Sequence, residues 1–110
     1  MNLFTIPPRA DEEFIETLVS SREVRVERIV SQGHCSPKGF WYDQPEAELV
    51  FLLSGNALLA FENCYVILTA GDSLFIPAHL KHRVEQTDTN NPCVWLCLFG
   101  EFEKNKENPS

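Results

Sequence analysis

The segments that decide the fold are Glu48-Leu49-Val50-Phe51-Leu52-Leu53-Ser54-Gly55 and Gly71-Asp72-Ser73-Leu74-Phe75-Ile76-Pro77-Ala78-His79-Leu80-Lys81-His82. In the first segment an acid is followed by an apolar run and a glycine, which is typical of a strand that ends in a turn. In the second, a glycine turn, a short apolar strand and a proline precede a histidine. The two segments place Glu48 and His82 at the ends of two strands, and this arrangement predicts a buried metal or small-molecule site.

Three spacings in these segments resemble the two sequence motifs of the cupin family. They run from Glu48 to Gly55, from Gly71 to Pro77 and from Pro77 to His82. The first cupin motif reads His-x-His, three or four residues, Glu, six residues, Gly. The second reads Gly, five residues, Pro-x-Gly, two residues, His, three residues, Asn. The resemblance implies an all-β double-stranded β-helix, the cupin or jelly-roll barrel, in which the residue that matches Glu48 is a metal ligand.

The chain departs from the family pattern at other ligand positions. The two histidines of the first motif fall on Tyr42 and Gln44 or on Trp41 and Asp43, depending on the spacing before the acid. Among these four, only Asp43 is a good hard ligand. In the second motif, His79 stands where the family has glycine.

Four residues are therefore the expected ligands of a divalent metal ion. Glu48 and His82 come from the motif matches, and Asp43 or His79 completes the set. Carboxylate and imidazole groups suit Zn, Fe, Mn or Ni, with positions left open for a ligand. Each residue also has a plainer interpretation: Glu48 at the wet end of a strand, His82 as a satisfied core histidine, Asp43 as a turn cap and His79 as a solvated loop residue. The expected substrate-binding residues are Gln44, Tyr42 and Trp41.

The 110 residues are expected to form one domain with a barrel core at about 29–99. A short amphipathic helix is expected at about 11–20, because Phe14, Ile15, Leu18 and Val19 recur at helical spacing behind a cluster of acids. The alternation of apolar and charged residues at 24–30 predicts a strand with one wet face. Between glycine and proline breakers, further strands are expected at 48–53, 57–61, 65–68, 73–76, 82–86 and 93–99. The polar tail, 103–110, is expected to fray.

Composition limits the partners of the chain. The net charge is -7, and nine Lys and Arg residues are spread along the sequence, so we expect neither nucleic-acid nor membrane binding. No apolar run approaches the roughly 20 residues that span a bilayer, and the N-terminus does not resemble a secretory signal, so a cytoplasmic protein is expected. Cys93 and Cys97 share a strand face and are expected to be buried, reduced thiols. A small-molecule ligand is the expected partner, and a homodimer is expected by analogy with the family.

Two classes of function remain open. The first is a metal-dependent enzyme that acts on a small polar metabolite, with oxygenase, isomerase and lyase types unresolved. The second is a non-catalytic module that binds or senses a metal or metabolite, and a barrel that has lost its metal is a third option. The missing motif histidines weaken the enzyme interpretation more than the binding module. The sequence has no glycine-rich phosphate loop and no nucleophile elbow, so no further catalytic residue is assigned.

Overall fold

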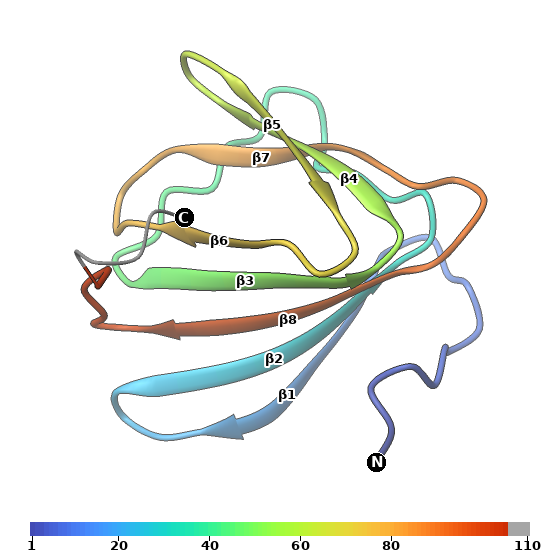
Figure 1. Ribbon diagram of the computed structural model, residues 1–110, viewed down its shortest axis with the longest axis horizontal. Helices are drawn as coiled ribbons and strands as arrows, with labels where there is room; N and C mark the ends of the chain where they lie inside the picture. Colours follow the sequence, from blue (N-terminus) through green and yellow to red (C-terminus); the bar gives the residue numbers. More distant parts are fainter. Residues whose placement is uncertain (106–110) are drawn as a thin grey trace.

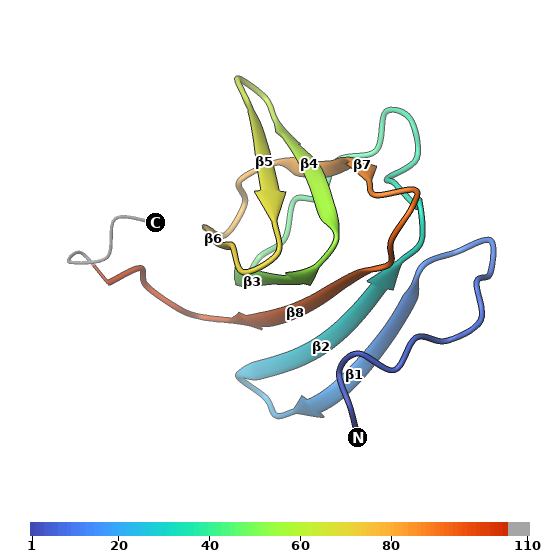
Figure 2. The same cartoon turned by 45° about the vertical axis from the view of Figure 1, so that its right-hand side comes forward.

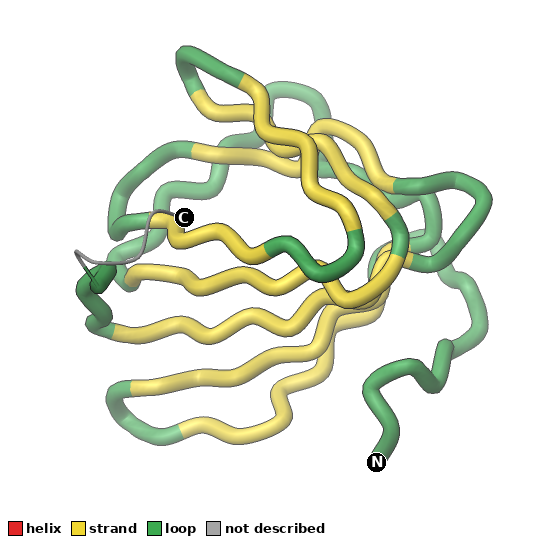
Figure 3. Tube along the Cα trace, in the orientation of Figure 1, coloured by secondary structure: helices red, strands yellow, loops and turns green. Residues whose placement is uncertain are grey.

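The computed structural model describes residues 1–105 and arranges them as strands and loops (Figures 1 and 3). The strands are β1 (Phe14–Ser20), β2 (Val24–Ser31), β3 (Ala47–Ser54), β4 (Asn56–Phe61), β5 (Tyr65–Thr69), β6 (Ser73–Ile76), β7 (His82–Thr87) and β8 (Cys93–Gly100). They form a five-stranded sheet in the order β1-β2-β8-β3-β6 and a three-stranded sheet in the order β5-β4-β7. Every paired neighbour is antiparallel. The predicted all-β fold is confirmed.

The two sheets are layers of a jelly roll. The chain crosses from the larger to the smaller sheet between β3 and β4, returns at β6, crosses again to β7 and returns at β8. Figure 2 shows the larger sheet curving so that β1 and β2 lie away from the smaller sheet. Strand β1 is an edge strand and pairs with β2 alone.

The prediction of a helix at about 11–20 is wrong, because most of this segment forms β1. Phe14, Glu16 and Leu18 are half-buried and the residues between them are exposed, which is the period of a strand. Three of the exposed residues of β1, Ile15, Thr17 and Val19, are β-branched and favour strands. Pairing with β2 places Glu16 opposite Arg28, with its carboxylate 3.1 Å from the guanidinium Nε. The available sheet edge therefore overrides the helical spacing of the apolar residues.

The core lies between the sheets and is centred on β8. Trp95, Cys97 and Phe99 alternate on the inner face of this strand and are buried. Leu52 from β3 and Leu59 from β4 belong to the same cluster. Full burial of such a side chain stabilises the fold by about 1.5–3 kcal/mol. Cys93 and Cys97 are buried free thiols, as predicted.

Two glycines of the sequence motifs form the turns that flank β3 and β6. Gly55 has a φ of +80°, and a Cβ atom there would lie 2.7 Å from Sγ of Cys93, so both conformation and space exclude a side chain. Gly71 has a φ of +97°, and its N–H donates to the carbonyl of Leu52 at 2.7 Å. The bond from Gly71 to Leu52 ties the start of β6 to β3 beside the residues at which the two strands pair.

The two ends of the chain lie outside the paired strands. The buried guanidinium of Arg28 donates to the carbonyls of Leu3 and Thr5 at 3.1 and 2.7 Å, which holds the N-terminal segment against the larger sheet. Of the tail expected to fray, residues 103–105 belong to no strand or helix, and residues 106–110 lie outside the described part of the chain. Within residues 1–105 we find no helix with the length and apolarity needed to span a membrane.

Candidate small-molecule site

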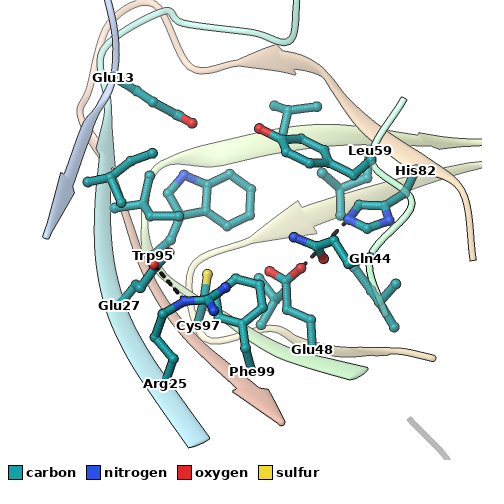
Figure 4. Close-up of a pocket in the computed structure, with 16 residues that line it drawn as sticks. Glu13, Arg25, Glu27, Gln44, Glu48, Leu59, His82, Trp95, Cys97 and Phe99 are labelled. Carbon is teal, nitrogen blue, oxygen red and sulfur yellow. Dashed lines mark hydrogen bonds and ion pairs between the residues drawn. The ribbon is translucent and has the colours of Figure 1, made fainter. Parts of the chain in front are cut away.

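A cavity of about 130 Å³ opens between the two sheets (Figure 4). Its apolar lining residues are Ile15, Ile29, Val50, Leu59, Ile76, Val84, Trp95 and Phe99. Its polar lining residues are Glu13, Arg25, Glu27, Tyr42, Gln44, Glu48, His82 and Cys97. Half of the lining residues are polar, but most of the lining surface is apolar, and a concavity of this kind is the usual form of a small-molecule site.

Glu48 and His82 meet inside this cavity from opposite sheets. Glu48 lies in β3 and His82 begins β7. Nε2 of His82 lies 3.6 Å from Oε1 of Glu48, which is longer than an ordinary hydrogen bond and is an ion pair when His82 is protonated. The two side chains are only 7% and 10% exposed, and Figure 4 shows them pointing toward one another. We call them the inner pair; their predicted role as metal ligands stays a prediction.

The imidazole of His82 is held in one orientation. Its Nδ1 lies 2.8 Å from the carbonyl oxygen of Leu80, so Nδ1 carries a proton and donates it to this bond. The ring of Tyr42 stacks on the imidazole with centroids 5.4 Å apart. The backbones of Tyr42 and His82 also exchange two hydrogen bonds, of 2.7 and 3.1 Å. Nε2 therefore faces Glu48.

The surroundings of the inner pair set its protonation. Burial lowers the pKa of His82, but the Glu48 carboxylate and the Leu80 carbonyl outweigh this effect and raise the pKa above its ordinary value. For Cys97, burial and then the negative charge of Glu48 raise the pKa well above that of an ordinary thiol. Cys97 is therefore a neutral thiol and not a nucleophile. The pair itself offers a proton donor, His82, beside a proton acceptor, Glu48.

Asp43 and His79 form a second carboxylate–imidazole pair outside the cavity, which we call the outer pair. Nδ1 of His79 lies 2.8 Å from Oδ1 of Asp43, and the side chains are 68% and 44% exposed. His79 has a φ of 62°, in the left-handed region, at the position where the family motif has glycine. Its backbone N–H donates to the carbonyl of Gln44 at 2.7 Å. The structure thus separates the four expected ligands into two pairs.

The donor set suits a divalent ion only in part. Residues 1–105 contain no group of three or more His, Cys, Asp or Glu side chains that could hold a metal ion. Glu48 and His82 have the donor chemistry that Zn, Fe, Mn or Ni accept. Two side chains are, however, one fewer than the three protein ligands of a mononuclear catalytic zinc site. The inner pair is therefore an incomplete ligand set by itself.

Of the three expected substrate-binding residues, two line the cavity and one does not. Tyr42 and Gln44 line the cavity, which supports their expected role without testing it. Trp41 is 38% exposed and does not line the cavity. The loop before β3 therefore presents two of its three candidate side chains to a ligand.

Arg25 and Glu27 of β2 line the cavity. The alternation of apolar and charged residues at 24–30 predicts instead that the charged face of this strand is exposed to solvent. Nε of Arg25 lies 2.8 Å from Glu27, and its Nη2 lies 3.0 Å from Glu46. The guanidinium carbon lies 4.2 Å from the ring centroid of Phe99. Ile29 lies on the same face of the strand, two residues beyond Glu27, and its apolar side chain was the feature of the sequence that could have indicated a partly buried face.

Glu13 is a further lining residue that the sequence does not single out. Its carboxylate accepts a hydrogen bond of 2.9 Å from the hydroxyl of Ser31. Burial raises the pKa of Glu13, and the bond from Ser31 offsets part of this rise. Because Glu13 precedes β1, only the pairing of β1 with β2 brings it to the cavity.

Comparisons with known proteins give a consistent family. The sequence profile described as a Cupin domain matches residues 29–99. A Ralstonia eutropha protein provisionally named a mannose-6-phosphate isomerase is 39% identical, with a TM-score of 0.88, 93% of this chain covered and 97% of that one. A cupin superfamily protein of Desulfitobacterium hafniense is 19% identical, with a TM-score of 0.73 and coverage of 88% and 84%.

A third structure, an RmlC-like cupin with a double-stranded β-helix fold from Methanocaldococcus jannaschii, is 16% identical, with a TM-score of 0.68 and coverage of 87% and 86%. At identities this low, it and the Desulfitobacterium protein support the fold alone. No curated protein matches the sequence.

Proposed function

The chain belongs to the cupin family, and we propose that it binds a small metabolite in the cavity between its sheets and exchanges a proton with it through the inner pair. The observation that carries this proposal is the buried contact of 3.6 Å between Glu48 and His82 inside that cavity. The provisional name of the Ralstonia relative, an isomerase, agrees with chemistry based on proton transfer.

The residues around the pair define how each group would act. His82, charged when both ring nitrogens are protonated, would donate from Nε2, because Nδ1 is committed to the Leu80 carbonyl. Glu48 would accept a proton as a carboxylate. The two side chains are at most 10% exposed, and this burial strengthens their electrostatic interactions with a bound ligand. Proton transfer of this kind serves isomerases and lyases.

A metabolite panel tests the proposal in four proteins: wild type, Glu48→Gln, His82→Gln and the matched control Asp43→Asn, which makes the same change in the outer pair. We expect ligands that raise the melting temperature of the wild type and the control to bind at least about tenfold more weakly to the two inner-pair variants. Solvent deuterium incorporation into the ligand, followed by NMR, reports proton exchange. Equal binding by all four proteins would contradict the proposal, and binding without exchange would leave a non-catalytic binding module.

A second candidate function is a metal-dependent enzyme, favoured by the position of the Leu80 carbonyl. A hydrogen bond to one ring nitrogen is how proteins orient a histidine whose other nitrogen binds metal. Glu48 and His82 would hold the ion. When bound, Zn, Fe, Mn or Ni would supply Lewis-acid chemistry to a substrate oxygen.

Elemental analysis of the purified protein distinguishes the ligand sets. If the inner pair binds metal, His82→Ala loses it and Asp43→Ala keeps it. Loss in both variants would mean that the outer pair completes the set. Metal retained in Glu48→Ala and His82→Ala would place the ligands elsewhere.

A further inference from the structure

Acidic groups outnumber basic groups on the cavity wall. The carboxylates of Glu13, Glu27 and Glu48 line it, against the side chains of Arg25 and His82. The guanidinium of Arg25 is already paired with two glutamates, and His82 is paired with Glu48. A phosphate group in the cavity would therefore be repelled by the carboxylates, and both cationic side chains would already be paired with an acid.

Glu13 is the cavity carboxylate without a cation in direct contact, although the more distant charge of His34 lowers its pKa. Within residues 1–105 it forms no ion pair, and its hydrogen-bond donor is the neutral hydroxyl of Ser31. The same hydroxyl accepts a bond of 3.1 Å from the indole N–H of Trp95, so the carboxylate and the indole are neighbours. Figure 4 shows the Glu13 carboxylate directed into the cavity on the side of Trp95, across from His82.

This corner of the cavity favours a positive charge in two ways. A cation next to Glu13 would offset the cost of keeping an unpaired carboxylate in a partly buried place, a cost visible in the raised pKa of Glu13. The indole of Trp95 lines the same cavity, and a cation held over its face rather than at its N–H edge would gain a further attraction. No other lining carboxylate combines an aromatic neighbour with a free charge, because Glu27 and Glu48 are paired.

The remaining walls define the rest of the ligand. Ile15, Ile29 and Val50 are apolar, and the cavity of about 130 Å³ is close to the size, about 150 Å³, at which an engineered apolar cavity binds benzene. We propose, as an extension that rests on the proposed function, that the cavity takes a small molecule with a protonated amine bound at Glu13, a compact hydrocarbon body, and a reacting end at the inner pair. It selects against phosphorylated ligands such as hexose phosphates.

Calorimetric titration at neutral pH tests this charge selection with benzylamine, benzyl alcohol, benzoate, inorganic phosphate and mannose 6-phosphate. The first three share one ring and differ mainly in charge. We expect the Kd of benzylamine to lie about tenfold or more below that of benzyl alcohol, because a charge-assisted contact replaces a neutral one. We expect no saturation with benzoate, phosphate or mannose 6-phosphate.

Glu13→Gln separates the charge from the shape of the site, because its amide oxygen can still accept the bond from Ser31. We expect the ratio of the benzyl alcohol and benzylamine Kd values to fall to about one, with benzyl alcohol binding unchanged, which also shows that the variant is folded. The control Glu62→Gln makes the same change of net charge at an exposed turn and should keep the wild-type ratio.

The outcomes distinguish this inference from the proposed function. Tighter binding of mannose 6-phosphate or benzoate than of benzylamine overturns the amine inference and leaves the binding function intact. Equal affinity of the wild type for benzylamine and benzyl alcohol also overturns the amine inference and leaves the binding function intact. An equal loss of selectivity in Glu62→Gln removes Glu13 as the anchor. If no compound binds, and the metabolite panel is also negative, both proposals fail.

Discussion

The inner pair and the outer pair contain the same two chemical groups in different surroundings. Asp43 and His79 are closer, at 2.8 Å, but 44% and 68% exposed, whereas Glu48 and His82 are 3.6 Å apart and at most 10% exposed. Water and salt screen the outer contact, while the low dielectric of the cavity leaves the inner contact strong. Burial, and not distance, therefore decides which pair matters for stability and chemistry.

The largest expected effect is the loss of one carboxylate from each pair. Glu48→Ala leaves a buried imidazole without its partner and should lower the free energy of unfolding by about 3 kcal/mol. Asp43→Ala removes an exposed pair and should cost about 0–1 kcal/mol. Urea unfolding of both variants measures the difference. An equal loss of unfolding free energy in the two variants would contradict this prediction, because it would mean that the charges in the cavity are screened as strongly as those at the surface.

The pH dependence of stability tests the inner pair alone. The pKa of His82 is raised in the folded protein above the unfolded value of about 6.5, so the native state holds this proton more tightly. The resulting stabilisation is complete below about pH 6.5 and is lost as pH rises through the folded pKa. We expect the stability difference between wild type and His82→Gln to shrink as pH rises. A difference that grows with pH would reverse the assigned sign.

The smallest expected effect is in the outer pair, at His79. His79→Gly removes the contact with Asp43 but also the left-handed strain of about 1–2 kcal/mol, and the flexibility of glycine in the unfolded chain costs about 0.5–1 kcal/mol. The net change in unfolding free energy should lie within about 1 kcal/mol of zero. His79→Val, which tolerates a positive φ poorly, should be clearly less stable in the same thermal melts.

The sequence predicts the inner pair because regular elements position it. Glu48 lies in a strand whose turn requires Gly55, and His82 begins a strand in the facing sheet. When the sequence spacing predicts where strands and turns begin and end, it also predicts the positions of the side chains at the strand ends. The strand ranges expected from 48 to 99 accordingly agree with β3 to β8 to within one or two residues.

The outer pair and β1 show where sequence patterns stop being sufficient. The direction of His79 depends on its left-handed backbone and on a bond to the Gln44 carbonyl, and neither feature has a spacing that can be recognised in one sequence. The spacing of Phe14 and Leu18 suits a helix as well as a strand, and the free edge of β2 decides between them. Arg25 was missed for a related reason, since charge alternation does not say what a face is turned toward.

Strand β1 is both the outermost strand of the larger sheet and, through Ile15, one wall of the cavity. Its backbone is bonded to one neighbour only, and edge segments open at a lower free energy than the centre of a sheet. The wall of the cavity that β1 forms is therefore expected to open at a lower free energy than the wall that β8 forms. The amide protons of β1 should accordingly exchange with solvent deuterium faster than those of β8.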